Sequence, residues 1–277
     1  MDPRLTACNG SFADIALRGK VDAEHFVEGE PTCVATPLAD VYNAPQGARI
    51  RQFLCGTELR VYEWRENLAL VQNQKDSYVG WVETSALSKD PIEKTHKVIV
   101  PTAHLYEEPN FKSKLIGHVT LGAEVRVDAL SNDYHQTPRG WLYHRTLSTL
   151  SEFASYPVRI AEMFLETPYL WGGNSALGLD CSGLVQLSCH ACGLPCPADS
   201  DLQERELGAP VDSTENLRRG DLIFWKGHVA WVHSPKTLIH ANAFHMSVQV
   251  EDTETALKRI AATSTGAPTG FKRLTAS

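Results

Sequence analysis

The feature that most constrains the fold is a repeat of strand-like segments in the first half of the chain. The first copy reads ADVYNAP at 39–45, GTELRV at 56–61 and VGWV at 79–82, and the second reads AHLYEEP at 103–109, GAEVRV at 122–127 and RGWL at 139–142. Each copy is about sixty residues long and ends in a Gly-Trp strand. Short strands separated by turn formers favour small antiparallel barrels, so the sequence predicts two barrels in succession.

The pattern changes after Leu150. Residues 158–165 carry apolar side chains at helical spacing and predict an amphipathic helix that ends before Pro168. Helix-like and strand-like segments then mix to the end of the chain. We therefore expect four parts, which are an N-terminal segment at 1–30, a first barrel at 31–90, a second barrel at 91–149 and an α+β domain at 150–277.

The composition argues against several functional classes. The net charge is −7 and the basic residues form no cluster, so a surface that holds nucleic acid or anionic lipid by its phosphates is not expected. No segment approaches the roughly 18 apolar residues of a membrane span. Asp14 interrupts the apolar stretch at 12–17, where a secretory signal needs a longer run. We expect a cytoplasmic chain with reduced thiols, because its seven cysteines are irregularly spaced. Nothing in the sequence indicates the oligomeric state.

A candidate nucleophile lies in the segments YLWGGNS at 169–175 and GLDCSGLVQ at 178–186. Asp180 is a favoured helix N-cap, which predicts that Cys181 occupies the first helical position. A helix N-terminus lowers the pKa of a cysteine, whereas the charge of Asp180 opposes this effect. The backbone amide of Cys181 and the hydroxyl of Tyr169 are candidate donors to an oxyanion.

A thiol that attacks an amide needs a base, and the base needs a third group to orient it. Two strands are predicted at 217–225 and 228–232, and His228 opens the second of them. A third strand is predicted at 237–242 and carries His240. The chain order of cysteine, histidine and histidine favours these two over the other histidines as partners of Cys181.

The Asp-Cys-Ser-Gly motif at 180–183, preceded by Tyr-x-Trp-Gly-Gly and followed by a Gly-Asp-Leu strand and a strand that opens with histidine, resembles the NlpC-type cysteine peptidases. The resemblance covers nearly the whole chain and implies an α+β fold, with a papain-like catalytic domain of permuted order preceded by two bacterial SH3-like barrels. It also implies that Cys181 is the nucleophile, His228 the base and His240 the orienting residue, with no metal and no cofactor.

The resemblance is closest to the dipeptidyl-peptidase-like members, which implies a murein peptide substrate. Such enzymes hydrolyse the bond between γ-D-glutamate and meso-diaminopimelate or L-lysine in wall peptides with a free N-terminal L-alanine, which implies a role in recycling. The substrate-binding candidates are Tyr169, Asp180, Ser182, Asp199 and Ser200, with Tyr78 and Glu58 from the first barrel. The chain departs from the family at Ala198, where arginine is frequent, and at Ala230, where glycine is usual.

Three other functions stay open. The chain could be an exported wall endopeptidase, a non-catalytic protein that binds wall fragments, or a thiol enzyme for acyl transfer or amidase chemistry. Cys189, Cys192 and Cys196 form half of a zinc pattern. Because structural zinc sites need a second ligand pair at set spacing, we expect these cysteines to pack in the core.

Overall fold

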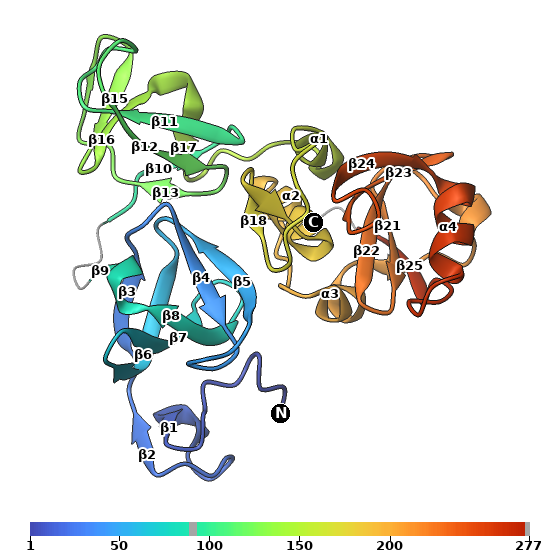
Figure 1. Cartoon of the computed structure of the whole chain (residues 1–277), viewed down its shortest axis with the longest axis horizontal. Coiled ribbons are helices and arrows are strands. Elements are labelled where there is room, and N and C mark those ends of the chain that lie inside the picture. Colours follow the sequence, from blue (N-terminus) through green and yellow to red (C-terminus); the bar gives the residue numbers. More distant parts are fainter. Residues whose placement is uncertain (89–92, 275–277) are drawn as a thin grey trace. The chain divides into compact units, whose positions relative to one another are not determined.

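The computed structural model describes residues 1–88 and 93–274, and the chain folds as two compact units, Met1–Leu150 and Ser151–Ser277. Figure 1 shows that strands dominate the first unit, whereas the second unit combines helices with a sheet. The boundaries expected inside the first unit stay predictions. Among the described residues, none of the helices has the length and the apolar character that crossing a bilayer requires. All seven cysteines are free thiols.

The N-terminal segment packs on the strands that follow it. Its strands β1 (Phe12–Asp14) and β2 (His25–Val27) pair in parallel. The backbone N–H of Val79 donates to the carbonyl of Arg4 at 2.7 Å. Ala7 is buried in one apolar cluster with Tyr62 and Trp81. The segment therefore extends the core of the first unit.

The first barrel is one antiparallel sheet in the order β5-β4-β8-β7-β6-β3-β9. Its strands are β3 (Glu30–Val34), β4 (Leu38–Tyr42), β5 (Arg49–Leu54), β6 (Glu58–Arg65), β7 (Leu68–Asn73), β8 (Val79–Glu83) and β9 (Leu87–Ser88). In β4, Ala39 and Val41 are buried while their neighbours are partly exposed, as alternation on a half-buried strand requires.

The second half of the first unit repeats this strand order. Its strands are β10 (His96–Val98), β11 (Thr102–Tyr106), β12 (Leu115–Thr120), β13 (Glu124–Val125), β14 (Ala129–Ser131), β15 (Tyr134–Thr137), β16 (Gly140–Tyr143) and β17 (Leu147–Thr149). They form the sheets β12-β11-β16-β15-β14 and β13-β10-β17. The first order matches β5-β4-β8-β7-β6, and β13 and β14 together take the place of the long β6. A 3-10 turn precedes the last strand in both copies.

The two copies meet through a close backbone contact at Gly56. The N–H of Glu124 donates to the carbonyl of Cys55 at 2.9 Å. Gly56 has a φ of +83°, and a Cβ at this position would lie 2.2 Å from the carbonyl oxygen of Glu124. Only glycine adopts this positive φ without strain and also leaves room for the carbonyl of Glu124. Cys55 itself is buried in the apolar core of the second copy.

The second unit contains a six-stranded antiparallel sheet in the order β20-β25-β21-β22-β23-β24. Its strands are β20 (Ala209–Pro210), β21 (Asp221–Trp225), β22 (His228–Ser234), β23 (Thr237–Asn242), β24 (Ser247–Asp252) and β25 (Gly270–Arg273), and a small hairpin is formed by β18 (Asn174–Ser175) and β19 (Gly178–Leu179). The helices are α1 (Pro157–Glu162), α2 (Cys181–Ala191), α3 (Ser200–Glu206) and α4 (Thr253–Ala261).

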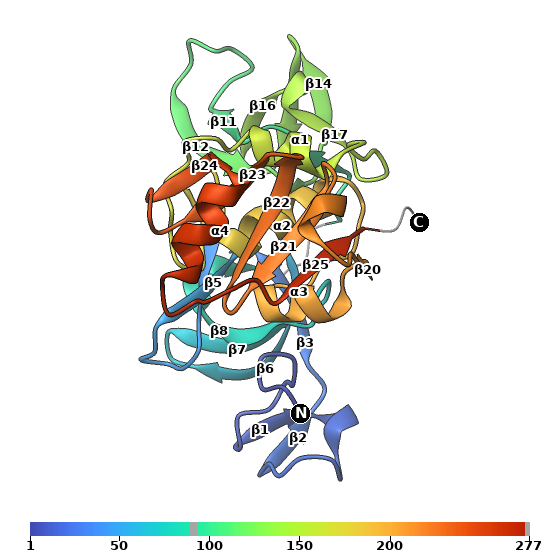
Figure 2. The ribbon, with the colours of Figure 1, turned by 90° about the vertical axis from the view of Figure 1, so that its right-hand side faces the viewer.

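Helices cover both faces of this sheet (Figures 1 and 2). Ala256 and Ile260 of α4 share an apolar cluster with Ile223 and Ala230. On the opposite face, α2 packs against β22 and β23. Figure 2 shows α4 in front of the sheet and α2 behind it. The sheet is therefore buried on both faces, which explains why β21 is apolar at nearly every position.

The elements that carry the predicted catalytic residues agree with the sequence. α2 begins at Cys181 after the N-cap Asp180, β22 begins at His228, and β23 contains His240. The predicted helix at 158–165 is wrong in its extent, because α1 ends at Glu162 and Leu165 is 43% exposed. Residues 163–166 continue as turns, and Glu166 has a φ of +65°, which an α-helix excludes.

A glycine of α2 allows a loop to cross the start of this helix. A Cβ on Gly183 would lie 2.4 Å from the carbonyl oxygen of Gly173, a backbone atom that cannot move alone. Gly183→Ala is expected to destabilise the chain by about 1–3 kcal/mol through overpacking, although alanine has the higher helix propensity. Calorimetric melting of the full chain measures this change.

Gly117→Ala is the control, because a Cβ there would meet only Leu105 Cδ1, at 3.9 Å. This variant is expected to melt at or slightly above the wild-type temperature. A Gly183→Ala variant as stable as the wild type would contradict the packing argument.

Candidate active site

Cys181 is held at the N-terminus of α2 by Asp180. One carboxylate oxygen of Asp180 accepts from the N–H of Gly183 at 2.7 Å and from the hydroxyl of Ser182 at 3.0 Å. The other oxygen accepts from the N–H of Gly172 at 2.9 Å. Asp180 thereby caps the helix and ties it to the glycine turn before it. Asp180 was predicted to bind substrate, and in the structure both of its carboxylate oxygens stabilise the local fold.

The thiol of Cys181 lies beside the first residues of β22. The backbone groups of Val229, Ser182 and Cys181 itself lie close enough to the sulfur to lower the pKa of the thiol. Since Val229 directly follows His228, the nucleophile and the candidate base are brought to the same point. Strand β22 pairs with β23 from Trp231 onward.

His228 continues into a chain of hydrogen bonds across the sheet. Its Nε2 lies 2.8 Å from Nδ1 of His240, and Nε2 of His240 lies 3.2 Å from Oε2 of Glu251. These residues stand on the neighbouring strands β22, β23 and β24. The ring of Trp225 lies 5.4 Å from the ring of His228, centroid to centroid. The two predicted histidines are therefore in direct contact.

Burial keeps the thiol and the imidazole uncharged. Cys181 is 6% exposed, and burial raises the pKa of its thiol to about 12, with a further rise from the charge of Asp180. Burial lowers the pKa of His228 to about 3, and His240 and Arg259 add to this effect. The N–H groups around the sulfur oppose the rise at Cys181. In the resting site the proton thus stays on sulfur, and a base must take it during attack.

Tyr169 and Ser182 also lie at this point. Burial raises the pKa of Tyr169, and the nearby Cys181 and Asp180 raise it further. Tyr169 therefore keeps its proton and is able to donate a hydrogen bond. Ser182 is buried, and its hydroxyl proton is directed at Asp180. A substrate group that contacts this hydroxyl would therefore meet it as an acceptor.

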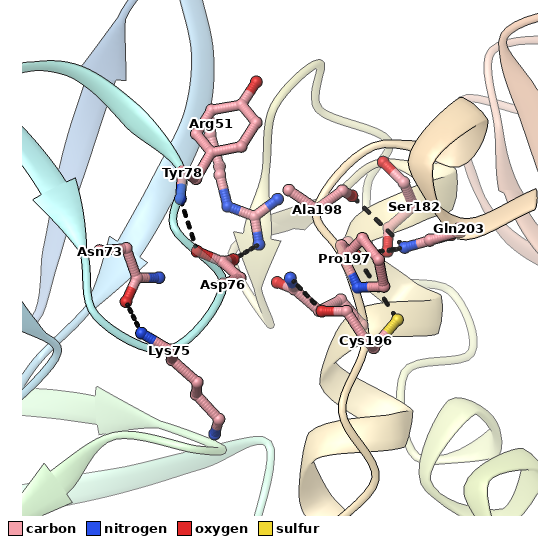
Figure 3. A network of polar contacts seen from close by, with 12 residues as sticks. Arg51, Asn73, Lys75, Asp76, Tyr78, Ser182, Cys196, Pro197, Ala198 and Gln203 are labelled. Carbon is pink, nitrogen blue, oxygen red and sulfur yellow. Dashed lines mark hydrogen bonds and ion pairs between the residues drawn. The ribbon is translucent and has the colours of Figure 1, made fainter. Parts of the chain in front are cut away.

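The segment with Asp199 and Ser200 is connected to α2 through Gln203. Nε2 of Gln203 donates to the carbonyls of Ser182 and Pro197 at 3.0 Å each, and to the carbonyl of Ala198 at 3.3 Å (Figure 3). Asp199 occupies the N-cap position of the short helix α3 without a side-chain capping hydrogen bond, and Ser200 begins the helix. Gln203 thus fixes the position of this segment relative to the residue that follows the nucleophile.

The two remaining candidates belong to the first unit. Tyr78 is 2% exposed, and the guanidinium of Arg51 lies 5.3 Å from its ring centroid. Asp76 accepts from the N–H of Tyr78 at 3.1 Å and forms a buried ion pair with Arg51 at 3.6 Å (Figure 3). Glu58 is exposed and pairs with Lys94 at 2.5 Å. The substrate contacts expected of Tyr78 and Glu58 stay predictions.

The two departures from the family pattern lie in the core. Ala230 is buried in the cluster beneath α4 with Ala256, so its methyl group packs against that helix. Ala198 is 1% exposed, and its carbonyl oxygen is the atom that Gln203 contacts. Among the described residues, no group of three or more His, Cys, Asp or Glu side chains has an arrangement that could hold a metal ion.

Sequence reasoning missed Gln203 and Glu251. Gln203 stands three residues after Ser200, a spacing that fits one turn of helix and could have indicated an inward-facing side chain. Glu251 has no comparable signal. Its contact with His240 depends on the register between β23 and β24, in which Leu238 lies opposite Glu251. A single sequence does not specify such a register.

Residues 166–263 match the NlpC/P60 family, and residues 41–87 match the bacterial dipeptidyl-peptidase SH3 domain. A γ-D-glutamyl-L-lysine dipeptidyl-peptidase of Bacillus cereus is 30% identical over 234 residues, which cover 72% of this chain and 69% of the relative. Dipeptidyl-peptidase 6 of Lysinibacillus sphaericus is 26% identical over 237 residues, which cover 76% of this chain and 86% of the relative.

The fold is also found in a solved structure. The crystal structure of an NlpC/P60 family protein from Bacillus cereus superposes with a TM-score of 0.74 at 22% identity, and the match covers 88% of this chain and 99% of that one. The second copy of the strand repeat lies outside the SH3 match, so its assignment as an SH3-like domain stays a prediction. The chain belongs to the NlpC/P60 family, carries a bacterial SH3 domain before its catalytic domain, and is a cysteine peptidase.

Proposed function

We propose that this chain hydrolyses the bond between γ-D-glutamate and a diamino acid in murein peptides that carry a free N-terminal L-alanine. The observation that carries the proposal is the thiol of Cys181 at a helix N-terminus near Val229, in the strand that His228 opens, together with the contact between His228 and His240. The choice of substrate is supported by the dipeptidyl-peptidase names of the relatives from Bacillus cereus and Lysinibacillus sphaericus.

In the proposed mechanism, the sulfur of Cys181 attacks the γ-carbonyl carbon of D-glutamate while its proton passes to His228. Because Nε2 of His228 contacts His240, Nδ1 is the nitrogen that takes the proton. The N–H of Cys181 and the hydroxyl of Tyr169 stabilise the oxyanion. His228 then gives its proton to the departing amine of the diamino acid. Water hydrolyses the resulting thioester and releases the L-alanyl-D-glutamate dipeptide.

Substrate selection is proposed to depend on the amino end of the peptide. A dipeptidyl-peptidase releases two residues, so it must recognise where the chain starts. The carboxylate of Asp199 and the hydroxyl of Ser200 are the proposed acceptors for the ammonium group of L-alanine, and Gln203 holds their segment in place. Tyr78 and Glu58 are proposed contacts from the first unit. Since a peptide still attached to glycan has no free amine, the activity fits the turnover of released peptides. The cytoplasmic location stays a prediction, which cell fractionation tests.

Cys181→Ala is expected to lower the rate of tripeptide hydrolysis by about 1000-fold or more, because the nucleophile is lost. The fold should survive, since alanine keeps most of the side-chain volume. Release of free lysine or diaminopimelate from the tripeptide is the measurement, with circular dichroism as the check on folding.

Cys192→Ala is the matched control, because Cys192 directly follows α2 and lies only partly buried. It should keep wild-type activity. Substantial turnover by Cys181→Ala would contradict the proposed mechanism.

The amino-end requirement predicts a difference between two forms of one substrate. L-Ala-γ-D-Glu-L-Lys, or its meso-diaminopimelate counterpart, is expected to be cleaved at the γ-D-glutamyl bond. The N-acetylated form should react at least about 100-fold more slowly, because its amide has no charge for Asp199. Chromatography of the products measures both rates.

Equal cleavage of the two forms would keep the peptidase chemistry and contradict recognition of the ammonium group. Cleavage of neither form would contradict the proposed substrate and favour acyl transfer or the binding of wall fragments.

A further inference from the structure

The hydrogen-bond chain that begins at His228 does not end at His240. We propose that Glu251 is a positioning residue that acts through His240 to fix which nitrogen of His228 carries a proton, so that Nδ1 faces the thiol as an unprotonated base. The inference rests on the proposed function, because it concerns the same site. It is carried by the contacts between Glu251, His240 and His228 and by the way Arg259 holds Glu251.

The direction of each hydrogen bond follows from the carboxylate. An ionised carboxylate only accepts, so Nε2 of His240 must carry the proton in its contact with Glu251. A neutral imidazole has one N–H group, so Nδ1 of His240 is an acceptor. Nε2 of His228, 2.8 Å away, must therefore be the donor. This leaves the lone pair on Nδ1 of His228, as a base for Cys181 requires.

This logic requires that His240 be neutral, and its surroundings favour that state. His240 is 1% exposed, and burial is the main cause of the lowered pKa of its imidazole, although the hydrogen bond and the charge of Glu251 oppose it. Arg259 and His245 lower the pKa of His240 further. The hydrogen-bond network thus consists of the two neutral imidazoles of His228 and His240 and the carboxylate of Glu251.

Arg259 keeps the carboxylate of Glu251 ionised and oriented. Its Nε donates to Oε1 of Glu251 at 3.0 Å, and its Nη2 donates to Oε2 at 2.6 Å. Such a two-pronged pair fixes the carboxylate plane. Burial alone would raise the pKa of Glu251. The hydrogen bonds from His240 and Arg259 nevertheless hold this pKa at about 2. The charges of Glu251 and Arg259 cancel, so the hydrogen-bonded residues from His228 to Arg259 add no net charge to the site.

The fold explains how Arg259 reaches Glu251. Helix α4 begins immediately after β24, and its N-cap Asp252 accepts from the N–H of Thr255 at 2.9 Å. Two turns later, Arg259 projects back onto the strand. Its guanidinium also lies 4.3 Å from the ring centroid of Phe244. Asp252 on β24 and His245 in the loop before it also interact electrostatically with this group of residues.

Glu251→Gln tests the proposal. An amide both donates and accepts, so His240 and then His228 would lose their fixed protonation pattern. We expect kcat for the tripeptide to fall by about 10- to 100-fold while KM stays within about twofold, since the variant changes a group that does not touch substrate. Glu251→Asp keeps the carboxylate and should recover part of the rate.

Glu254→Gln is the matched control. Glu254 carries the same charge on α4, but it is exposed and pairs with Lys258 at 2.5 Å. This variant should have wild-type kcat and KM. An equal loss in Glu251→Gln and Glu254→Gln would show that any loss of acidic charge lowers activity, and would overturn the proposal.

Imidazole nitrogen NMR of the full chain gives a readout that needs no turnover. In the wild type, His228 and His240 are each expected to carry their proton on Nε2, and Glu251→Gln should change this pattern while Glu254→Gln should not. A wild-type His240 with its proton on Nδ1 would overturn the inference even if Glu251→Gln does not fold. If the wild type and Glu254→Gln both leave the tripeptide intact, the proposed function fails, and the nitrogen spectra still decide the role of Glu251.

Discussion

The chemistry of the second unit depends on placing a cysteine thiol and an imidazole at the same buried point. Burial disfavours the charged form of both groups, which raises the pKa of Cys181 and lowers that of His228. The proton must therefore pass from Cys181 to His228 while the new carbon–sulfur bond forms. Because both groups are buried, bulk water does not solvate the charges that develop. Fixed dipoles take the role of water. The backbone groups of Val229, Ser182 and Cys181 lower the pKa of the thiol, so they favour negative charge on the sulfur as it develops.

The same constraint explains why the surrounding backbone is packed so closely. The start of α2 must lie against β22 for Val229 to reach the sulfur, and the loop before α2 must cross the helix at Gly183. Asp180 holds this arrangement by accepting from the N–H groups of Gly172 and Gly183. Its negative charge works against the thiolate. We infer that its part in the local fold outweighs this electrostatic cost.

Local sequence was sufficient for the elements that carry the chemistry. Asp180 marked the start of α2, and short apolar runs marked β22 and β23 with His228 and His240 in place. The repeat likewise indicated the barrel strands, because turn formers and alternation are local signals.

Contacts that depend on long-range register were not predictable in this way. The approach of Val229 to Cys181 depends on how helix and sheet pack together, and the contact of Glu251 with His240 depends on strand register. Helix α1 ended three residues earlier than its apolar pattern indicated, because the chain turns after Glu162. The apolar pattern marked buried positions such as Phe164 without marking where the helix stops.

The central claim is that Cys181 forms a covalent bond with the γ-glutamyl group of the substrate. The most direct test is mass spectrometry of the enzyme after acid quenching during turnover of the L-Ala-γ-D-Glu-L-Lys tripeptide. The account predicts an L-alanyl-γ-D-glutamyl adduct on the peptide that contains Cys181, absent when the quench precedes substrate. Product formation with the adduct on another residue would contradict the account.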